Sequence, residues 1–162
     1  MATENNTSIL IKELTDLINK GNAHATFEEA VEDLPLNLLT VTPELLPYNI
    51  WQLAEHIRIA QWDIVEFCIN PKHQSPKWPD EYWVDANSTV TAAQWMECID
   101  EIKKDRSRFL DFLSKSADDL FKPLEHGSGQ NLLREALLIA DHTSYHIGEI
   151  IIIRRLLKSW KS

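Results

Sequence analysis

Leucine and isoleucine recur every three or four positions near the start of the chain, at Ile9, Leu10, Leu14, Leu17 and Ile18. This spacing is typical of an amphipathic helix with one buried face, and it predicts a helix over about residues 3–20. Gly21 follows directly, and glycine is common at a helix end. A short second helix is expected over residues 26–34, because Thr26 and Glu29 have the spacing of a capping box and a proline comes next.

A longer apolar pattern begins at Asn49 and ends before Pro71. Its apolar face contains Ile50, Leu53, Ile57, Ala60, Ile64 and Phe67. Asn49 is a favoured N-cap residue and Gln52 follows three positions later, so we expect a capped helix over residues 49–70.

The next segment, residues 71–89, is rich in proline and aromatic side chains. It contains three prolines together with Trp78, Tyr82 and Trp83. A loop of this length is uncommon as a simple connection, and such loops often cover a functional site.

Two more helices are expected in the second half of the chain. Thr91 and Gln94 form a capping box at the start of a helix that continues to about Lys115. The last helix follows a glycine-rich turn and runs to about Lys158. Its isoleucine run, residues 150–153, is β-branched and could indicate a strand. The length and the helical period favour a helix, with an apolar face of Leu132, Ile139, Ile150, Ile153 and Leu157.

Four long amphipathic helices predict an all-α fold, a four-helix bundle with a long crossover loop between helices two and three. The composition agrees, because 4 Gly and 7 Pro are too few for the many tight turns of a barrel or sandwich. A length of 162 residues is that of one domain, so we expect residues 1–162 to form a single domain.

The charge balance argues against two classes of partner. The formal net charge is -9, from 16 basic and 25 acidic residues. Nucleic acids are bound largely through clustered Lys and Arg, and anionic membrane surfaces also attract basic patches. Short basic runs such as Lys103–Arg108 are explained by solvated helix faces. We therefore expect neither a nucleic-acid nor a membrane partner.

The chain is expected to be cytoplasmic. The N-terminal segment lacks the basic and apolar regions of a secretory signal. No apolar run reaches the length of a membrane span, and the isoleucine run at 150–153 is flanked by Glu149 and Arg154. Cys68 and Cys98 fit neither a disulfide framework nor a CxxC site, and they are expected to be inert, reduced core thiols.

Two histidines fall on the apolar face of the last helix. At 100° per residue, His142 and His146 lie within the arc of the buried isoleucines, and Glu135 and Glu149 lie on or beside it. A buried imidazole needs a partner on each nitrogen, and buried carboxylates are costly unless they are paired or bind a metal. This face is therefore too polar to be an ordinary core face.

Histidines four residues apart on a helix can chelate one cation, provided that a third ligand comes from another helix. His56, on the second long helix, is the candidate, whereas His24, His73 and His126 fall in linkers and loops. The alternative is that all three are structural histidines, since an HxxxH pair alone is a weak signal. Spacing alone leaves both interpretations open.

The last helix, with the string "LLREALLIADHTSYHIGEIIIIRRLL", resembles the hallmark of the DinB-like (YfiT-type) metal-binding four-helix bundles. The second-helix string "IWQLAEHIRIAQWDIVEF" and "WPDEYW" in the loop after it resemble that family as well. The resemblance extends from about Thr26 to Trp160, with the motifs in the expected order.

The resemblance implies an up-down-down-up type of bundle that is commonly a homodimer. It also implies a divalent metal ion, nickel or zinc, bound by three histidines, which here are His56, His142 and His146. Characterised members include transferases that use low-molecular-weight thiols, which suggests thiol attack on a small electrophile. The family is named for a damage-inducible gene, but nothing in this acidic chain indicates contact with DNA.

Glu149 is a departure from the family pattern, because relatives often carry glutamine after the HxG string. Its carboxylate could hydrogen-bond a metal-bound water, act as a catalytic base or bind the metal. Alternatively, Glu149 could pair with an arginine such as Arg134 or Arg58. Tyr145 could also contact substrate, but it lies off the central arc and is expected to pack at a helix interface.

Two functions follow as hypotheses. The first is a metal-dependent enzyme, a thiol S-transferase or, as second chemistry, a hydrolase, with Glu149 as its catalytic residue. The second is a non-enzymatic, dimeric metal-binding protein of a stress response. A further apolar stripe supports a homodimer, unless these residues contact other helices of the same chain: Leu133, Leu137, Ile151, Trp51, Trp62, Val65 and Ile69.

Overall fold

Capping side chains define the starts of three helices as the sequence predicts. In the computed structural model, Thr26, Asn49 and Thr91 each accept a hydrogen bond from the backbone N–H three residues on. The Glu or Gln at that third position accepts one in return from the N-cap backbone, so all three capping boxes are complete.

The structure describes residues 6–161, and within them the chain forms five α-helices and no β-strand. The α-helices are α1 (Asn6–Lys20), α2 (Phe27–Val31), α3 (Ile50–Ile69), α4 (Ala92–Lys115) and α5 (Leu132–Leu156). Three short 3₁₀ turns lie at Leu36–Leu38, Asp80–Tyr82 and Ala117–Asp119. The all-α fold is therefore confirmed.

Most helix boundaries agree with the sequence patterns, and the deviations are at the ends. The expected start of α1 at residues 3–5 lies outside the described residues. The second helix is shorter than expected, because Glu32, directly after Val31, has a non-helical ψ of 136° and Asp33 then adopts a positive φ of 52°. Gly21, which ends α1, has φ +63°, and a Cβ there would come within 2.9 Å of His24. This turn therefore favours glycine.

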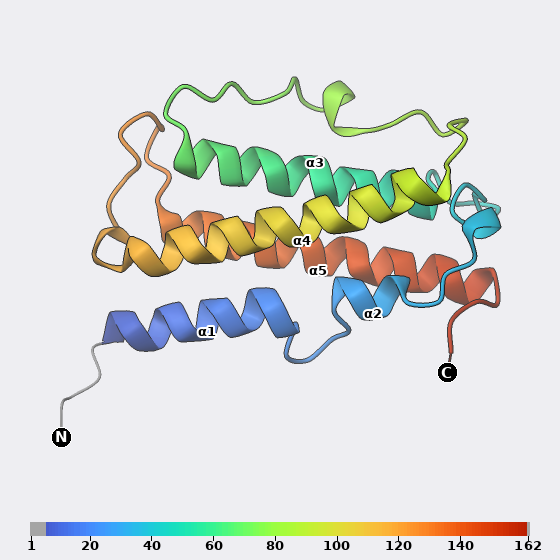
Figure 1. Ribbon diagram of the computed structural model, residues 1–162, viewed down its shortest axis with the longest axis horizontal. Coiled ribbons are helices and arrows are strands. Elements are labelled where there is room, and N and C mark those ends of the chain that lie inside the picture. Colours follow the sequence, from blue (N-terminus) through green and yellow to red (C-terminus); the bar gives the residue numbers. More distant parts are fainter. Residues whose placement is uncertain (1–5, 162) are drawn as a thin grey trace.

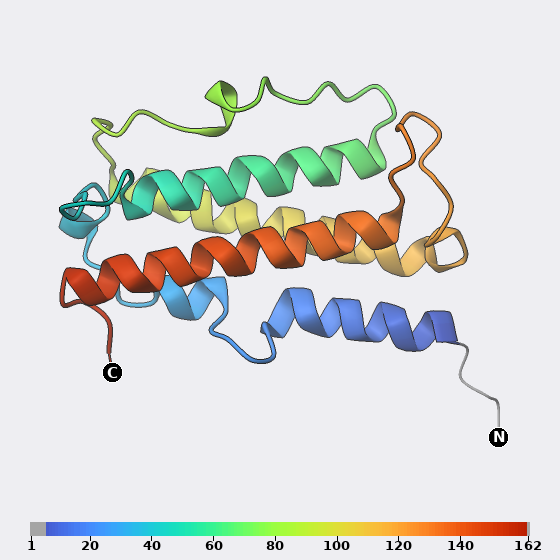
Figure 2. The same ribbon diagram turned by 180° about the vertical axis from the view of Figure 1, so that it is seen from behind.

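The helices follow an up-down-down-up course (Figure 1). In that view α1 and α5 run from left to right, whereas α3 and α4 both run from right to left. Because α3 and α4 are parallel, the segment between them must return along the whole bundle, and it does so beside α3 (Figures 1 and 2). This segment, residues 70–91, is the expected crossover loop, and we refer to it by that name.

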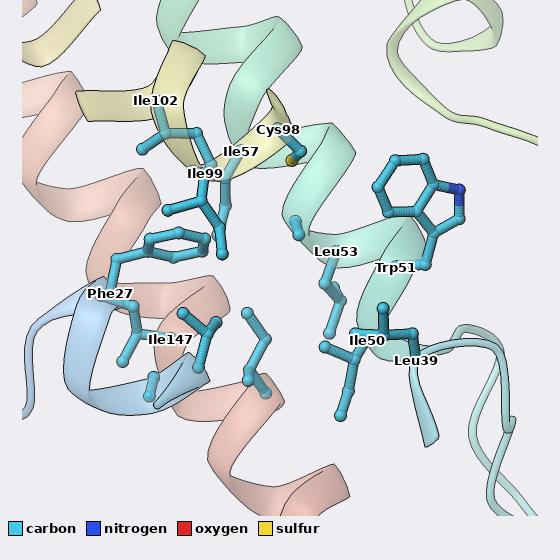
Figure 3. Close-up of a cluster of buried hydrophobic side chains, with 14 of the residues drawn as sticks. Phe27, Leu39, Ile50, Trp51, Leu53, Ile57, Cys98, Ile99, Ile102 and Ile147 are labelled. Carbon is cyan, nitrogen blue, oxygen red and sulfur yellow. The ribbon is translucent and has the colours of Figure 1, made fainter. Parts of the chain in front are cut away.

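The bundle interior contains two apolar clusters at its two ends. The first cluster contains side chains from α2, from the first halves of α3 and α4 and from the end of α5 (Figure 3). Its fully buried members include Phe27, Ile50, Leu53, Ile102 and Ile150. The other cluster includes Leu14, Val65, Phe109, Leu113 and Ile139. Buried polar side chains lie near the junction of the two clusters, among them His56, Gln61, Asp105 and His146.

Helix α5 is central to this arrangement and packs against α1, α2 and α3. By length and composition alone it could cross a membrane, and 33% of its most apolar window is buried inside the chain. Its isoleucine run forms helix, as the helical period predicts, and Ile150 and Ile153 are fully buried. The bundle core therefore accounts for the buried part of the apolar character of α5.

Candidate metal centre

Three histidines from two helices meet in the middle of the bundle. The Nε2 atoms of His142 and His56 lie 3.1 Å apart, and those of His146 and His142 lie 3.2 Å apart. Among the described residues these three form the one group of His, Cys, Asp or Glu side chains arranged to hold a metal ion, with ligand atoms all within 4.8 Å. The structure thus brings together the three residues that the sequence indicates.

His56 is fixed by contacts with the crossover loop. Its Nδ1–H donates to the backbone carbonyl oxygen of Tyr82 at 3.0 Å. Because a carbonyl can only accept, this hydrogen bond places the proton on Nδ1 and leaves the Nε2 lone pair free. The Trp83 indole stacks on the His56 ring, with centroids 4.0 Å apart and planes 6° apart. His56 is therefore held in the tautomer and orientation that a metal ligand needs.

His146 is fixed in the same sense by a carboxylate. Its Nδ1 donates to Glu149 Oε2 at 2.7 Å, and the Tyr48 hydroxyl donates to the other carboxylate oxygen. Both carboxylate oxygens of Glu149 are thus engaged, and the Nε2 of His146 points toward the other two histidines. This is the carboxylate–histidine arrangement found behind many metal ligands.

Burial favours the neutral form of two of the three imidazoles, those of His56 and His142. Desolvation lowers the pKa of His56, and desolvation together with the nearby His146 and His56 lowers the pKa of His142 to about 4. His56 and His146 are buried, and His142 is half-buried. At neutral pH His56 and His142 therefore present unprotonated nitrogens, which is the form that binds metal ions.

The donor set fits a metal ion well. A tetrahedral ion with bonds of about 2.05 Å to nitrogen requires ligand nitrogens about 3.3 Å apart, close to the two Nε2 separations of 3.1 and 3.2 Å. The Nδ1 hydrogen bonds leave the Nε2 atoms of His56 and His146 without protons, so their lone pairs converge near His142. In the metal-free protein the Nε2–H tautomer of His142 can donate to these nitrogens, whereas a bound cation would engage all three lone pairs.

The remaining histidines and the cysteines lie elsewhere. His24 contacts the neighbouring Ala25 carbonyl, and His126 contacts the Phe67 carbonyl. Both cysteines are free and buried, and burial raises the pKa of the Cys68 thiol to about 12 and that of Cys98 further still. The expectation that these thiols are inert is consistent with this burial.

The arginine alternatives for Glu149 are wrong. Arg134 pairs with the buried Glu135, and Arg58 pairs with Glu55 at 2.7 Å. Glu149 instead belongs to the histidine cluster through His146.

Tyr145 does not pack at a helix interface of this chain either. Its side chain is 65% exposed, and its ring centroid lies 5.0 Å from that of His146. Trp78, in the crossover loop, is 70% exposed and lies 6.2 Å from the His56 ring. Two exposed aromatic side chains therefore stand beside two different metal-ligand candidates.

Sequence reasoning missed the residues that orient the histidines. Tyr48 lies in the connection before α3, and Tyr82 acts through its backbone carbonyl, for which side-chain patterns give no signal. Asp63 lies seven residues after His56 on α3, and its carboxylate accepts hydrogen bonds from the Tyr82 hydroxyl and His73. The proline-rich, aromatic composition of the loop indicates that it covers a site, but composition does not identify which of its residues contact the histidines.

Comparison with known proteins identifies one family. Residues 22–150 match the family model described as the DinB superfamily, and this range covers most of the chain and all three histidines. A search among curated proteins finds no match, and neither does a search among solved structures.

Proposed function

The chain belongs to the DinB superfamily, and we propose that it binds one divalent metal ion through His56, His142 and His146 and uses it in thiol S-transfer to small electrophiles. The observation that carries the metal proposal is the convergence of the three Nε2 atoms, two of them with the Nδ1 proton held by a defined acceptor. Metal binding to His56 and His142 displaces few protons at neutral pH, because burial already favours the neutral form of these two ligands.

Nickel and zinc are the proposed ions. Imidazole nitrogen suits both, and the site offers three histidines without a thiolate or a carboxylate among the ligands. Three protein ligands leave coordination positions open for a substrate, which is typical of catalytic sites, whereas structural zinc sites have four.

The proposed chemistry is nucleophilic substitution by a low-molecular-weight thiol. A bound metal ion, held by the three histidines, would supply Lewis acidity, which lowers the pKa of a thiol and favours release of its proton to solvent. The sulfur then forms a bond to the electrophilic carbon, and the leaving group departs with the electron pair of the broken bond. The chain's own part is to orient the imidazoles through Glu149 and the Tyr82 carbonyl, which makes Glu149 a positioning residue for His146.

The electrophile is proposed to carry an apolar or aromatic body. Trp78 is exposed beside His56 and offers a large aromatic side chain to such a ligand. Exposed aromatic side chains next to a reactive centre provide stacking surface for such a ligand.

A non-enzymatic metal-binding role in a stress response is the second candidate, and one observation favours it over a hydrolase. Both oxygens of Glu149 already accept hydrogen bonds, from His146 and Tyr48, so this carboxylate is poorly placed to activate water as a general base. Thiol transfer would need no such base, because the Lewis acidity of a bound metal ion would itself lower the pKa of the thiol.

We also propose a cytoplasmic location and a homodimer. Two free, buried cysteines suit a reducing compartment. Exposed apolar residues on α5 offer a surface for a second copy of the chain. No nucleic-acid or membrane partner is proposed, given the net charge of -9.

Elemental analysis tests the metal proposal first. Protein purified without a nickel affinity column should contain about one zinc or nickel ion per chain. His56→Ala should lose it, whereas His24→Ala, which removes an exposed histidine from a linker, should keep it. Absence of metal from the parent chain, or its retention by His56→Ala, would contradict the proposal.

Turnover then separates the two candidates. The metal-loaded chain and His56→Ala are assayed with monobromobimane and a panel of low-molecular-weight thiols. Thiol-dependent turnover that is lost in His56→Ala supports the transferase. Stoichiometric metal without any thiol-dependent turnover would favour the non-enzymatic role.

A further inference from the structure

The crossover loop is attached to α3 at one carboxylate. Asp63 Oδ1 accepts a hydrogen bond from His73 Nε2 at 2.7 Å, and Asp63 Oδ2 accepts one from the Tyr82 hydroxyl at 2.6 Å. His73 lies near the start of the loop and Tyr82 near its middle. One side chain of α3 therefore holds two separated points of the loop, and we call Asp63, His73 and Tyr82 the loop latch.

The loop latch is largely shielded from water. The side chains of His73 and Asp63 are 7% and 13% exposed, and Tyr82 is buried. The Trp62 ring covers His73, with centroids 5.2 Å apart at an angle of 89°. Hydrogen bonds to a carboxylate are strengthened by such shielding, so the latch is a firm attachment.

The residue held by the latch is also the one that orients a metal ligand. The Tyr82 hydroxyl is held by Asp63, while its backbone carbonyl oxygen accepts the Nδ1–H of His56. Asp63 and His56 are seven residues apart on α3, so they share one face of the helix and lie about 10 Å apart along its axis. Tyr82 spans this distance and joins the latch to the histidine cluster.

We propose that Asp63 is a positioning residue for the metal centre, acting through Tyr82 on His56. This inference rests on the proposed metal binding. Without the Asp63 carboxylate, the crossover loop loses the hydrogen bonds of His73 and of the Tyr82 hydroxyl. The Tyr82 carbonyl is then held against His56 less firmly, by remaining loop contacts such as the hydrogen bond from Gln52 Nε2 to the Val84 carbonyl. The imidazole then rotates and exchanges its tautomer more freely, so the metal site is less well organised before binding.

The connection through Tyr82 also implies that metal binding affects the order of the crossover loop. If the ordered loop favours metal binding, then metal binding must favour the ordered loop by an equal factor. Lys72 and Lys77 are exposed in this loop and are potential trypsin sites. Zinc should therefore slow tryptic cleavage at these lysines in the parent chain, and it should do so much less in Asp63→Ala.

Zinc affinity, measured by competition with a fluorescent chelator, tests the proposal. Asp63→Ala should weaken zinc binding by about 10- to 100-fold, the usual effect of losing a partner that orients a metal ligand. Glu66→Ala is the matched control, because Glu66 lies one turn further along α3 and pairs with Arg108 of α4 rather than with the loop. It should bind zinc within about threefold of the parent.

A milder variant covers the case in which Asp63→Ala fails to fold. Tyr82→Phe removes a single hydroxyl and leaves the backbone carbonyl in the chain, and it should also weaken zinc binding, by less than Asp63→Ala does. Thermal unfolding of the metal-free variants measures their stability. It shows whether zinc affinity falls in variants that are still folded, or only because the variants are destabilised.

The outcomes separate this inference from the proposed function. A parent chain that binds neither zinc nor nickel would overturn both. A parent that binds zinc, with Asp63→Ala and Tyr82→Phe binding equally tightly, would overturn the role of the latch and leave the metal centre in place.

Discussion

At the scale of single residues, Glu149 is the side chain whose environment most constrains the chemistry. It is half-buried between His146 and Tyr48, and each of its oxygens accepts one hydrogen bond. A carboxylate in this position fixes the His146 tautomer and increases the electron density on Nε2. Its contacts therefore indicate an effect on metal affinity, while a direct part in catalysis stays a prediction.

Two substitutions of Glu149 should have different effects on metal binding. Glu149→Ala should weaken zinc affinity by about 10- to 100-fold, because His146 loses the acceptor at Nδ1. Glu149→Gln should cost much less, since an amide oxygen can still accept from that nitrogen. Chelator competition measures both, with exposed Glu97→Ala as control. Equal losses in the alanine and glutamine variants would show that charge, rather than orientation, matters.

The histidine cluster should also make the metal-free protein sensitive to acid. The folded chain lowers the pKa of His142 to about 4, against an ordinary value of 6.5. Between these values the unfolded state binds a proton that the folded state does not, so stability falls as the pH is lowered from 6.5 toward 4. Between pH 7 and pH 5 this amounts to at most about 2 kcal/mol.

Urea unfolding in the presence of a chelator measures this effect. The loss of stability between pH 7 and pH 5 should be smaller in His142→Gln than in the parent, because the glutamine does not titrate. His56, whose pKa is also lowered by burial, acts in the same direction and remains in the variant. An identical loss in both proteins would contradict the assignment to His142.

The residue scale also shows how far sequence reasoning reaches into the site. His142 and His146 were predictable because a helix places residues four apart on one face. His56 followed from its place near the apolar face of another helix. Tyr48 and the Tyr82 carbonyl were not predictable, because contacts across the loops depend on how irregular segments fold over the bundle. Periodicity carries no information about them.

At the scale of elements, the N-cap of α3 links the start of a helix to the site. Asn49 is fully buried, and it caps the helix that carries His56. Its side-chain nitrogen also lies 3.4 Å from the carbonyl oxygen of Ala86, in the crossover loop. Thr91, the N-cap of α4, has the same capping box but is exposed. The two caps therefore form a matched pair that differs in burial.

Removing each cap should show this difference. Thr91→Ala should destabilise the chain by about 1 kcal/mol, the usual value for an N-cap. Asn49→Ala should cost more, about 2 kcal/mol, because backbone groups that it satisfies would stay buried without partners. Denaturant unfolding of the metal-free proteins gives both values. A smaller loss for Asn49→Ala than for Thr91→Ala would contradict the argument from burial.

The N-termini of the helices were more predictable from the sequence than their C-termini. Capping residues give local chemical signals: the two predicted capping boxes form, and the predicted N-cap Asn49 forms a third with Gln52. Helix C-termini have weaker signals, which is why the short α2 ends at Val31, three residues before the expected position. The long crossover between α3 and α4 was predictable from loop length, whereas the parallel course of these helices was implied by the family resemblance.

At the scale of the whole molecule, α5 has an exposed apolar face in addition to its buried face. Leu137, Tyr145, Ile152 and Leu156 are between 48% and 65% exposed. At 100° per residue these four positions fall within one arc of about 100°, with the exposed Gly148 inside it. The stripe expected from the sequence is not this one, because Trp51 and Val65 are buried within the chain. Of that earlier set, Leu137 belongs to the exposed face.

This face predicts an isologous dimer in which α5 packs against α5 of a second copy. A twofold axis near Gly148 would let the helices approach closely and would cover the apolar side chains of both copies.

Ile152→Glu places a charge on the exposed face of α5 and should convert a dimer into a monomer, as measured by light scattering after size exclusion. Met96→Glu is the control, because Met96 is 54% exposed but lies on α4. Both variants should retain stoichiometric zinc, which shows that they are folded. A monomeric parent, or a dimer that survives Ile152→Glu, would exclude this face as the interface.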